Sequence, residues 1–304
     1  MESIKYNNVL VTGGSGFVGK RLSIIKPKWN YISSKDLNLL NLDACMNFFS
    51  VNKFDAVIHL AAKTGGIEES VNNQSEMYFL NSIMNNNIVY ACQKNKIKRL
   101  LSCLSTCSYQ DIANSYPMKE DIFLEGEVTD SNYGYGLSKR ELFRQSNFCR
   151  KFYDLNYSCF TPCNLYGPDS NFNEKKSHFI ASMLKKIHLA KDGQVIEVFG
   201  NGESYRQHLY IDDLARIIPQ MLIFHNSSLP LNVASEDNLQ IKEIINIIQK
   251  VLKKRIEIKF TNNFLGQFRK DVSILNLKQL IPNIELTTLE EGILQTYKWF
   301  LNKS

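Results

Sequence analysis

The residues best suited to chemistry are a tyrosine and a lysine four positions apart, together with a serine upstream. Tyr135 and Lys139 share one face of a predicted helix. A neighbouring ammonium lowers the pKa of a phenol from its ordinary value of about 10, so we expect Tyr135 to exchange protons near neutrality. Ser105 ends a predicted strand, where its hydroxyl can polarise a substrate carbonyl beside the phenol. The spacing of Tyr135 and Lys139 alone is common by chance, but with Ser105 it predicts hydride transfer at a carbonyl.

A glycine-rich turn near the N-terminus predicts the cofactor. A predicted strand, 8–12, runs directly into the spacing G-x-x-G-x-x-G, and a predicted helix follows. Glycine permits the tight turn and lets the backbone approach a pyrophosphate at the helix N-terminus. An ordinary glycine-rich turn has the same composition, but the strand before it and the helix after it favour a dinucleotide site. The residues expected there are Gly13, Ser15, Gly16, Phe17, Val18 and Gly19.

The turn after the second predicted strand, 29–33, bears on which dinucleotide binds. Sites that prefer NAD usually place Asp or Glu here, to hold the ribose 2′-hydroxyl. This chain has Ser34 and Lys35 instead, and Arg21 lies on the first helix. A lysine attracts a 2′-phosphate that a carboxylate would repel, so the sequence favours NADPH. Asp36 is close enough to leave NADH as an alternative.

Two further segments are expected to line the dinucleotide. Asp43 is predicted to reach the adenine, to cap the helix that begins nearby, or to do both. Small residues after the third strand let a nucleotide lie against the sheet. They are Leu60, Ala61 and Ala62. His59 lies inside the apolar strand and is interpreted as a packed structural residue, and His188, His208 and His225 as structural or surface residues.

The order of these elements predicts an α/β protein with a Rossmann-type, doubly wound parallel sheet. The predicted strands of the first half are 8–12, 29–33, 56–60, 99–104 and 158–162. The predicted helices between them are 16–25, 44–52, 75–95 and 133–155. Helices at 177–190, 212–224, 241–252 and 288–302 follow, with strands at 195–199 and 256–259. We interpret residues 1–165 as the dinucleotide-binding domain and residues 166–304 as a smaller, mixed α/β substrate-binding portion.

With these motifs in place, the chain resembles the extended short-chain dehydrogenases, and among them the GDP-L-fucose synthase group. The resemblance runs nearly end to end. Its specific pieces are Leu60-Ala-Ala-Lys-Thr-Gly-Gly-Ile67, Ser105-Thr-Cys107, Asn164-Leu-Tyr-Gly-Pro168 with Asn171-Phe172, Ser177-His178, Arg206 and Gln267-Phe-Arg-Lys270. It implies a homodimer formed by helices 75–95 and 133–155. It also implies that Met77, Leu80, Ile83, Met84, Leu142, Phe143 and Phe148 contribute to that interface, unless these residues face the sheet.

The resemblance assigns the site residues as follows. Ser105, Tyr135 and Lys139 are the reductase triad. Cys107 and His178 are the acid/base pair of a 3,5-epimerisation, which is reasonable because a C4 ketone acidifies the hydrogens at C3 and C5 and both groups exchange protons near neutrality. The GDP-sugar is expected to lie along Asn164, His178, Lys186, Arg206 and Lys270. Without the resemblance, His178 would be interpreted as a solvent-facing residue at a helix N-terminus, and Lys186 as part of a solvated helix face.

The chain departs from the group's pattern in its substrate half. The departures are Cys163, Asp169-Ser170, Phe199 and Leu265. They leave open an enzyme that only reduces, as relatives acting on GDP-4-keto-heptoses do. A nucleotide-sugar 4-epimerase and a non-catalytic dinucleotide-binding protein are further alternatives. A 4,6-dehydratase is excluded because Cys107-Ser108 stands where that activity requires an Asp-Glu pair.

Composition limits the class of protein. The 304 residues are 44% hydrophobic and 22% charged, which is typical of globular proteins. A net charge of +6 with scattered basic residues indicates no nucleic-acid partner. No segment approaches a membrane span or a signal peptide, so we expect a cytoplasmic protein. The seven cysteines include no C-x-x-C pair and indicate neither disulfides nor a metal site.

Overall fold

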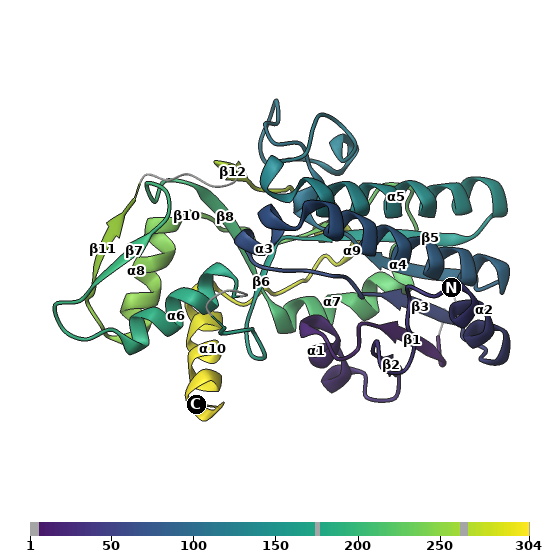
Figure 1. Ribbon diagram of the computed structural model, residues 1–304, viewed down its shortest axis with the longest axis horizontal. Helices are drawn as coiled ribbons and strands as arrows, with labels where there is room; N and C mark the ends of the chain where they lie inside the picture. The colour runs from purple at the N-terminus through teal and green to yellow at the C-terminus, as the bar shows by residue number, and fades with distance from the viewer. Residues whose placement is uncertain (1–5, 174–176, 262–266, 304) are drawn as a thin grey trace.

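The central feature of the fold, seen in a computed structural model, is a six-stranded parallel sheet (Figure 1). The structure describes residues 6–173, 177–261 and 267–303. The strand order is β2 (Asn30–Ile32), β1 (Val9–Thr12), β3 (Ala56–His59), β4 (Arg99–Cys103), β5 (Asn156–Pro162) and β9 (Leu231–Val233). The inner strands are short and almost wholly buried, as strands covered on both faces must be.

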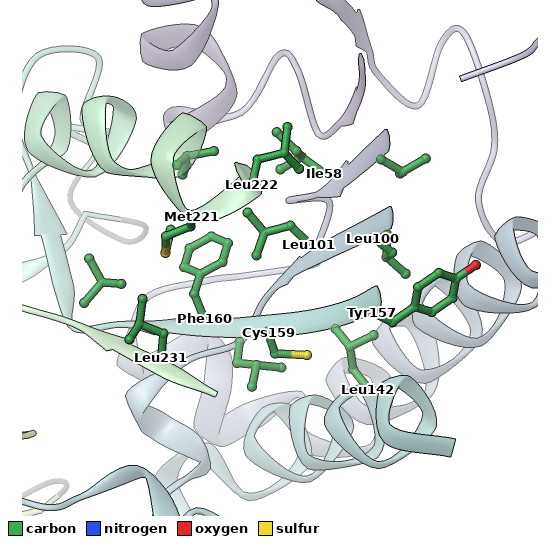
Figure 2. Close-up of a cluster of buried hydrophobic side chains, with 14 of the residues drawn as sticks. Ile58, Leu100, Leu101, Leu142, Tyr157, Cys159, Phe160, Met221, Leu222 and Leu231 are labelled. Atoms are coloured by element: carbon green, nitrogen blue, oxygen red, sulfur yellow. The ribbon is translucent and has the colours of Figure 1, made fainter. Parts of the chain in front are cut away.

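Helices cover both faces of this sheet. In Figure 1, α4 (Gln74–Lys94) and α5 (Tyr133–Tyr153) lie on one face, and α1 (Phe17–Ile25) and α7 (Ile211–Phe224) lie on the other. Helix α2 (Leu42–Val51) packs beside α4. Figure 2 shows Met221 and Leu222 of α7 on one side of the sheet and Leu142 of α5 on the other. These side chains are buried. The predicted Rossmann-type fold is confirmed.

The second part of the molecule is a smaller mixed α/β unit with its own apolar core. Its four-stranded sheet places β8 (Tyr205–Tyr210) between β10 (Asn238–Gln240) and β12 (Arg269–Lys270), and β6 (Asn164–Tyr166) also pairs with β8. A two-stranded sheet joins β7 (Val195–Val198) and β11 (Glu257–Phe260). The helices that carry most of this core are α6 (Phe179–Leu189), α8 (Ile241–Leu252) and α10 (Leu289–Lys303).

The chain crosses between the two parts more than once. Helix α7 packs against α1 and so covers the large sheet, and β9 pairs with β5 and so extends it. Both elements follow residue 166 in the sequence. The predicted contiguous substrate portion, 166–304, therefore needs correction, because 211–233 and apolar residues between 272 and 286 pack into the core of the large sheet. Two short helices were not predicted, namely α3 (Ile67–Asn72) and α9 (Leu275–Leu280). None of the helices in the described ranges is long and apolar enough to cross a membrane.

Candidate active site

One cavity of about 980 Å³ lies where the two parts meet. The carboxyl ends of β1, β3 and β4 form its floor on the sheet side, which is where ligands bind in doubly wound folds. Nearly all the sequence-predicted site residues line it. They are Gly13, Ser15, Gly16, Phe17, Val18, Gly19, Ser34, Leu60, Ala61, Ala62, Ser105, Cys107, Tyr135, Lys139, Asn164, His178, Lys186, Arg206 and Lys270. Lys35 and Asp43 lie outside the lining, and both are exposed.

The glycine turn has the close backbone contacts that its sequence predicts. Gly13 has φ +72°, and a Cβ there would lie 2.7 Å from the Ala61 backbone nitrogen. A Cβ on Gly19 would clash with the Gly13 carbonyl oxygen. Gly16 is the N-cap of α1 and provides no side-chain cap, so the first amides of the helix stay available to an anion at the cavity. This backbone cradle fits the pyrophosphate of a dinucleotide.

The turn after β2 presents no free carboxylate to a ribose. Asp36 accepts hydrogen bonds from the backbone nitrogen and the hydroxyl of Ser33, both at 2.8 Å. These bonds lower the pKa of Asp36, and the carboxylate is committed to its own turn. Ser34 lines the cavity, and Lys35 lies beside it with an exposed side chain. The alternative of NADH, which depended on Asp36, loses its support.

Arg21, whose place on the first helix suggested a cation for the 2′-phosphate, is engaged elsewhere. Its guanidinium pairs with both carboxylate oxygens of Asp212, at 2.6 and 2.8 Å, and reaches Asp169 at 3.4 Å. It is therefore engaged with α7 and the loop after β6, not with a 2′-phosphate.

Asp43 is not a helix cap. The N-cap of α2 is Asn41, whose side chain accepts a hydrogen bond from the Ala44 backbone nitrogen at 2.9 Å. Asp43 lies in the exposed first turn of that helix, where a carboxylate favours the positive end of the helix dipole. Its predicted contact with adenine stays a prediction.

The serine of the predicted triad is placed by a short turn. Ser105 is the N-cap of a single 3₁₀ turn, Thr106–Ser108, and its hydroxyl accepts a hydrogen bond from the Cys107 backbone nitrogen at 3.1 Å. This arrangement holds the Ser105 hydroxyl and the Cys107 thiol on the same cavity wall.

Tyr135 and Lys139 share one face of α5, as predicted, but their electrostatics differ from the prediction. Lys139 is buried, and its ammonium donates to the Cys103 carbonyl oxygen at 2.8 Å while lying 5.7 Å from the centroid of the Tyr135 ring. Burial lowers the pKa of Lys139. Burial also raises the pKa of Tyr135 well above its ordinary value. The expectation of a lowered tyrosine pKa was therefore wrong, because burial of the phenol has the largest effect on its pKa, and Tyr135 is a proton donor at neutral pH.

A buried hydrogen-bond chain supports the catalytic helix. His59 Nδ1 lies 2.8 Å from Thr12 Oγ1, and His59 Nε2 lies 3.0 Å from Asn85 Oδ1. The Asn85 amide then donates to the Ser138 carbonyl oxygen at 3.1 Å. Burial lowers the pKa of His59 to about 3, so the ring is neutral. As expected from its apolar strand, His59 is a structural residue, and it ties β1 and β3 to α5.

Cys107 has a cationic partner that sequence reasoning did not assign. The Lys270 ammonium lies 2.9 Å from the Cys107 sulfur. Burial raises the pKa of the Cys107 thiol, but the charge and hydrogen bond of Lys270, with smaller effects from Ser105 and Arg206, bring it below its ordinary value. The Arg206 guanidinium donates to the carbonyl oxygens of Tyr205 at 2.7 Å and Gln267 at 2.6 Å. No local pattern predicts the Lys270 contact, because the partners are 163 residues apart.

The substrate end of the cavity carries two histidines. His178, the N-cap of α6, is exposed to the cavity, and partial desolvation lowers its pKa. His208 is buried between Tyr166 and Phe179, and burial lowers its pKa to about 3. Within the described residues, His208 Nδ1 and the Ser177 hydroxyl are buried polar atoms without a partner, and both residues line the cavity. Two polar groups at this wall of the cavity therefore have no hydrogen-bond partner among the described residues.

Comparison with known proteins matches the chain to one family and to named relatives. The family model described as the NAD dependent epimerase/dehydratase family matches residues 9–234. A Drosophila melanogaster protein named probable GDP-L-fucose synthase is 34% identical, with 96% of this chain and 97% of that protein covered. The Yersinia pseudotuberculosis GDP-L-colitose synthase is 32% identical, with 97% and 98% covered.

Solved structures agree with this placement. A Naegleria fowleri GDP-L-fucose synthetase bound to NADP superposes with a TM-score of 0.88 at 32% identity, covering 98% of this chain and 93% of that one. A GDP-6-OMe-4-keto-L-xylo-heptose reductase from C. jejuni reaches a TM-score of 0.90 at 20% identity, covering 99% and 100%. The second likeness is one of fold alone.

Proposed function

Because the chain belongs to the NAD dependent epimerase/dehydratase family, we propose that it is a cytoplasmic, NADPH-dependent reductase of a GDP-linked 4-keto sugar that also epimerises the sugar at C3 and C5. One observation carries the proposal. A single cavity joins the glycine cradle to Tyr135 and, further along, to Cys107 and His178. A dinucleotide and a sugar ring placed there meet a proton donor for a ketone and two acid/base groups for its neighbouring carbons.

The cofactor is NADPH, in keeping with the NADP-bound Naegleria fowleri relative. When bound, it supplies the hydride for the ketone. The residues that would hold it are the backbone of Gly13 and Gly16 at the pyrophosphate, and Ser34 and Lys35 at the 2′-phosphate. Ala61, after β3, leaves space for the nucleotide against the sheet.

Reduction uses the triad. Tyr135 is protonated because burial raises its pKa, so its hydroxyl donates a proton to the C4 oxygen as the ketone is reduced. The Ser105 hydroxyl polarises the same carbonyl. The Lys139 ammonium is held by the Cys103 carbonyl, which fixes its positive charge near the Tyr135 ring.

Epimerisation uses the second pair. A ketone at C4 acidifies the hydrogens at C3 and C5, and Cys107 and His178 exchange protons with these carbons. The Cys107 thiol has a lowered pKa and sits two residues after Ser105, beside the reduction site. Asn164, Lys186 and Arg206 line the remaining length of the cavity, where we place the GDP portion, with the cations near its phosphates. Lys270 contacts Cys107, and this contact supports assigning Lys270 to the sugar end of the cavity.

We also propose a homodimer formed by α4 and α5, which pack side by side. The apolar residues expected at this interface need correction. Met77, Leu142 and Phe143 are buried within the subunit, and Leu80 and Met84 line the cavity. Phe148 is exposed, as the interface requires, and Phe79, Tyr90 and Phe152 are further exposed aromatic side chains of these helices. We call these four residues the aromatic face.

The test is a substrate panel. Protein, NADPH and a series of GDP- and UDP-linked 4-keto sugars are combined, and NADPH oxidation is followed. We expect turnover with GDP-4-keto-6-deoxymannose. Turnover with GDP-4-keto-heptoses alone would replace the proposal by the reductase-only alternative, for which Asp169, Ser170 and Phe199 are the departures to examine first. Tight binding of NADPH with no oxidation by any sugar would favour the non-catalytic alternative.

A further inference from the structure

Lys270 has an unusual position for a lysine. It lies on β12, opposite Arg206 of β8 in the parallel register, and its side chain is only 8% exposed. Its ammonium is 2.9 Å from the Cys107 sulfur. Within residues 6–173, 177–261 and 267–303, no carboxylate forms an ion pair with Lys270, since the adjacent Asp271 is engaged by Arg269 at 2.6 Å. A buried ammonium without a carboxylate needs another anion or acceptor for its N–H groups.

The Cys107 sulfur is the group that meets this requirement. An ammonium has three donors and no acceptor, so the sulfur is the acceptor in this contact. A thiolate accepts such a bond far better than a neutral thiol, because the bond is then charge-assisted. The Ser105 hydroxyl also lies within reach of this turn, through its bond from the Cys107 backbone nitrogen. Lys270, Ser105 and Arg206 each favour a negative charge on the sulfur and lower the pKa of the Cys107 thiol.

The other cysteines provide an internal comparison. All seven are free thiols. Burial raises the pKa of the six others, and Cys103, four residues before Cys107, is raised to about 11. Cys107 experiences burial too, but it alone has a lysine ammonium in contact with its sulfur. The difference between two neighbouring thiols therefore comes from a residue 163 positions away in the sequence.

We propose that Lys270 is a positioning residue that holds Cys107 as a thiolate before substrate binds, in addition to any contact with the nucleotide. The role of this thiolate in catalysis rests on the proposed epimerisation. There the thiolate takes a proton from a carbon next to the C4 ketone, becoming a thiol, and the C–H electron pair moves into the enolate whose oxygen is the former ketone. A proton returned to that carbon restores the ketone, and loss of the thiol proton restores the ion pair.

The first measurement uses the protein without substrate. The rate of Cys107 alkylation by iodoacetamide is followed against pH, with the modified peptide identified by mass spectrometry. For the wild type, we expect the midpoint of the curve of alkylation rate against pH to lie below that of free cysteine. In Lys270→Met this midpoint should rise by at least about one pH unit, which corresponds to a roughly tenfold loss of thiolate near neutrality. Lys270→Arg should keep most of the effect. Lys186→Met, which removes another cavity cation, should leave the midpoint in place. An unchanged midpoint in Lys270→Met would overturn the proposal.

The second measurement separates this proposal from the proposed function. In heavy water, Lys270→Met should lose deuterium uptake at C3 and C5 near neutral pH and regain it as the pH rises. That loss should exceed any loss of NADPH oxidation with an already epimerised ketone. If the wild type takes up no deuterium but its midpoint depends on Lys270, the proposed epimerisation fails and the ion pair stands. If uptake occurs and the Lys270→Met pH profile matches the wild type, the ion pair fails and the epimerisation stands.

Discussion

Proton donation by Tyr135 is the residue-scale feature on which reduction depends. Because burial raises its pKa well above the ordinary value, the phenol is protonated throughout the neutral range, and the donor form is lost only at strongly alkaline pH. Tyr135→Phe removes the proton and should lower kcat for NADPH oxidation by about 10²–10⁴-fold. NADPH affinity, measured by fluorescence titration, should change little. A variant with near wild-type kcat would show that another group donates the proton.

Selectivity for NADPH is a second residue-scale prediction. Lys35 follows the cavity-lining Ser34 and is the nearest cation in that turn, since Arg21 is committed to Asp212. Lys35→Ala should weaken NADPH binding by at most about 10- to 150-fold, which is the ~1.5–3 kcal/mol of one hydrogen bond to a charged group. NADH, which lacks the 2′-phosphate, is the control and should bind as before. An equal loss for both cofactors would contradict the assignment of Lys35.

Local spacing explains which site residues the sequence could predict. The glycine turn and the pair Tyr135 and Lys139 lie within single elements, so their positions follow from short-range geometry. The contact between Cys107 and Lys270 depends on β12 pairing with β8, which no local pattern encodes. The direction of the Tyr135 pKa shift also needed the tertiary structure, because burial of the phenol raises its pKa and local spacing does not reveal that burial.

At the scale of elements, Arg21 connects helix α1 to α7 and to the loop after β6. The guanidinium is bidentate to Asp212 and reaches Asp169, one of the residues that depart from the group's pattern. Arg21→Met leaves two half-buried carboxylates unpaired and should lower the free energy of unfolding by about 1–3 kcal/mol. The control is Lys20→Met, an exposed position on the same helix. Denaturant unfolding measures both, and equal stabilities would contradict this role.

The sequence predicts best those helices and strands whose apolar residues repeat with a clear period. Helix α8 was predicted with its observed bounds, Ile241–Leu252, because its apolar residues repeat at helical spacing. Strand β8 was missed because Gln207 and His208 are buried in it, which hides the apolar alternation. Strand β9 has only three residues and gives almost no pattern. Its place at the edge of the large sheet explains why the predicted contiguous substrate portion failed.

At the scale of the whole molecule, the aromatic face is the feature that predicts assembly. Phe79, Phe148 and Phe152 are 59%, 56% and 65% exposed. If two copies bury this face, the wild type should sediment as twice the 35.0 kDa chain, and Phe79→Glu with Phe148→Glu should give monomers that keep their fold. Phe224→Glu, at a comparably exposed residue on α7, is the control and should stay dimeric. A wild type that sediments only as the single chain at micromolar concentration would contradict the dimer.

The central claim is that proton exchange at two carbons and reduction at a third occur in one cavity. The most direct measurement incubates the wild type with GDP-4-keto-6-deoxymannose and NADPH in heavy water and examines the product by NMR and mass spectrometry. We expect oxidation of NADPH together with solvent deuterium at C3 and C5. NADPH oxidation with a pre-epimerised ketone, and no deuterium at either carbon, would contradict it and leave a reductase whose substrate is epimerised elsewhere.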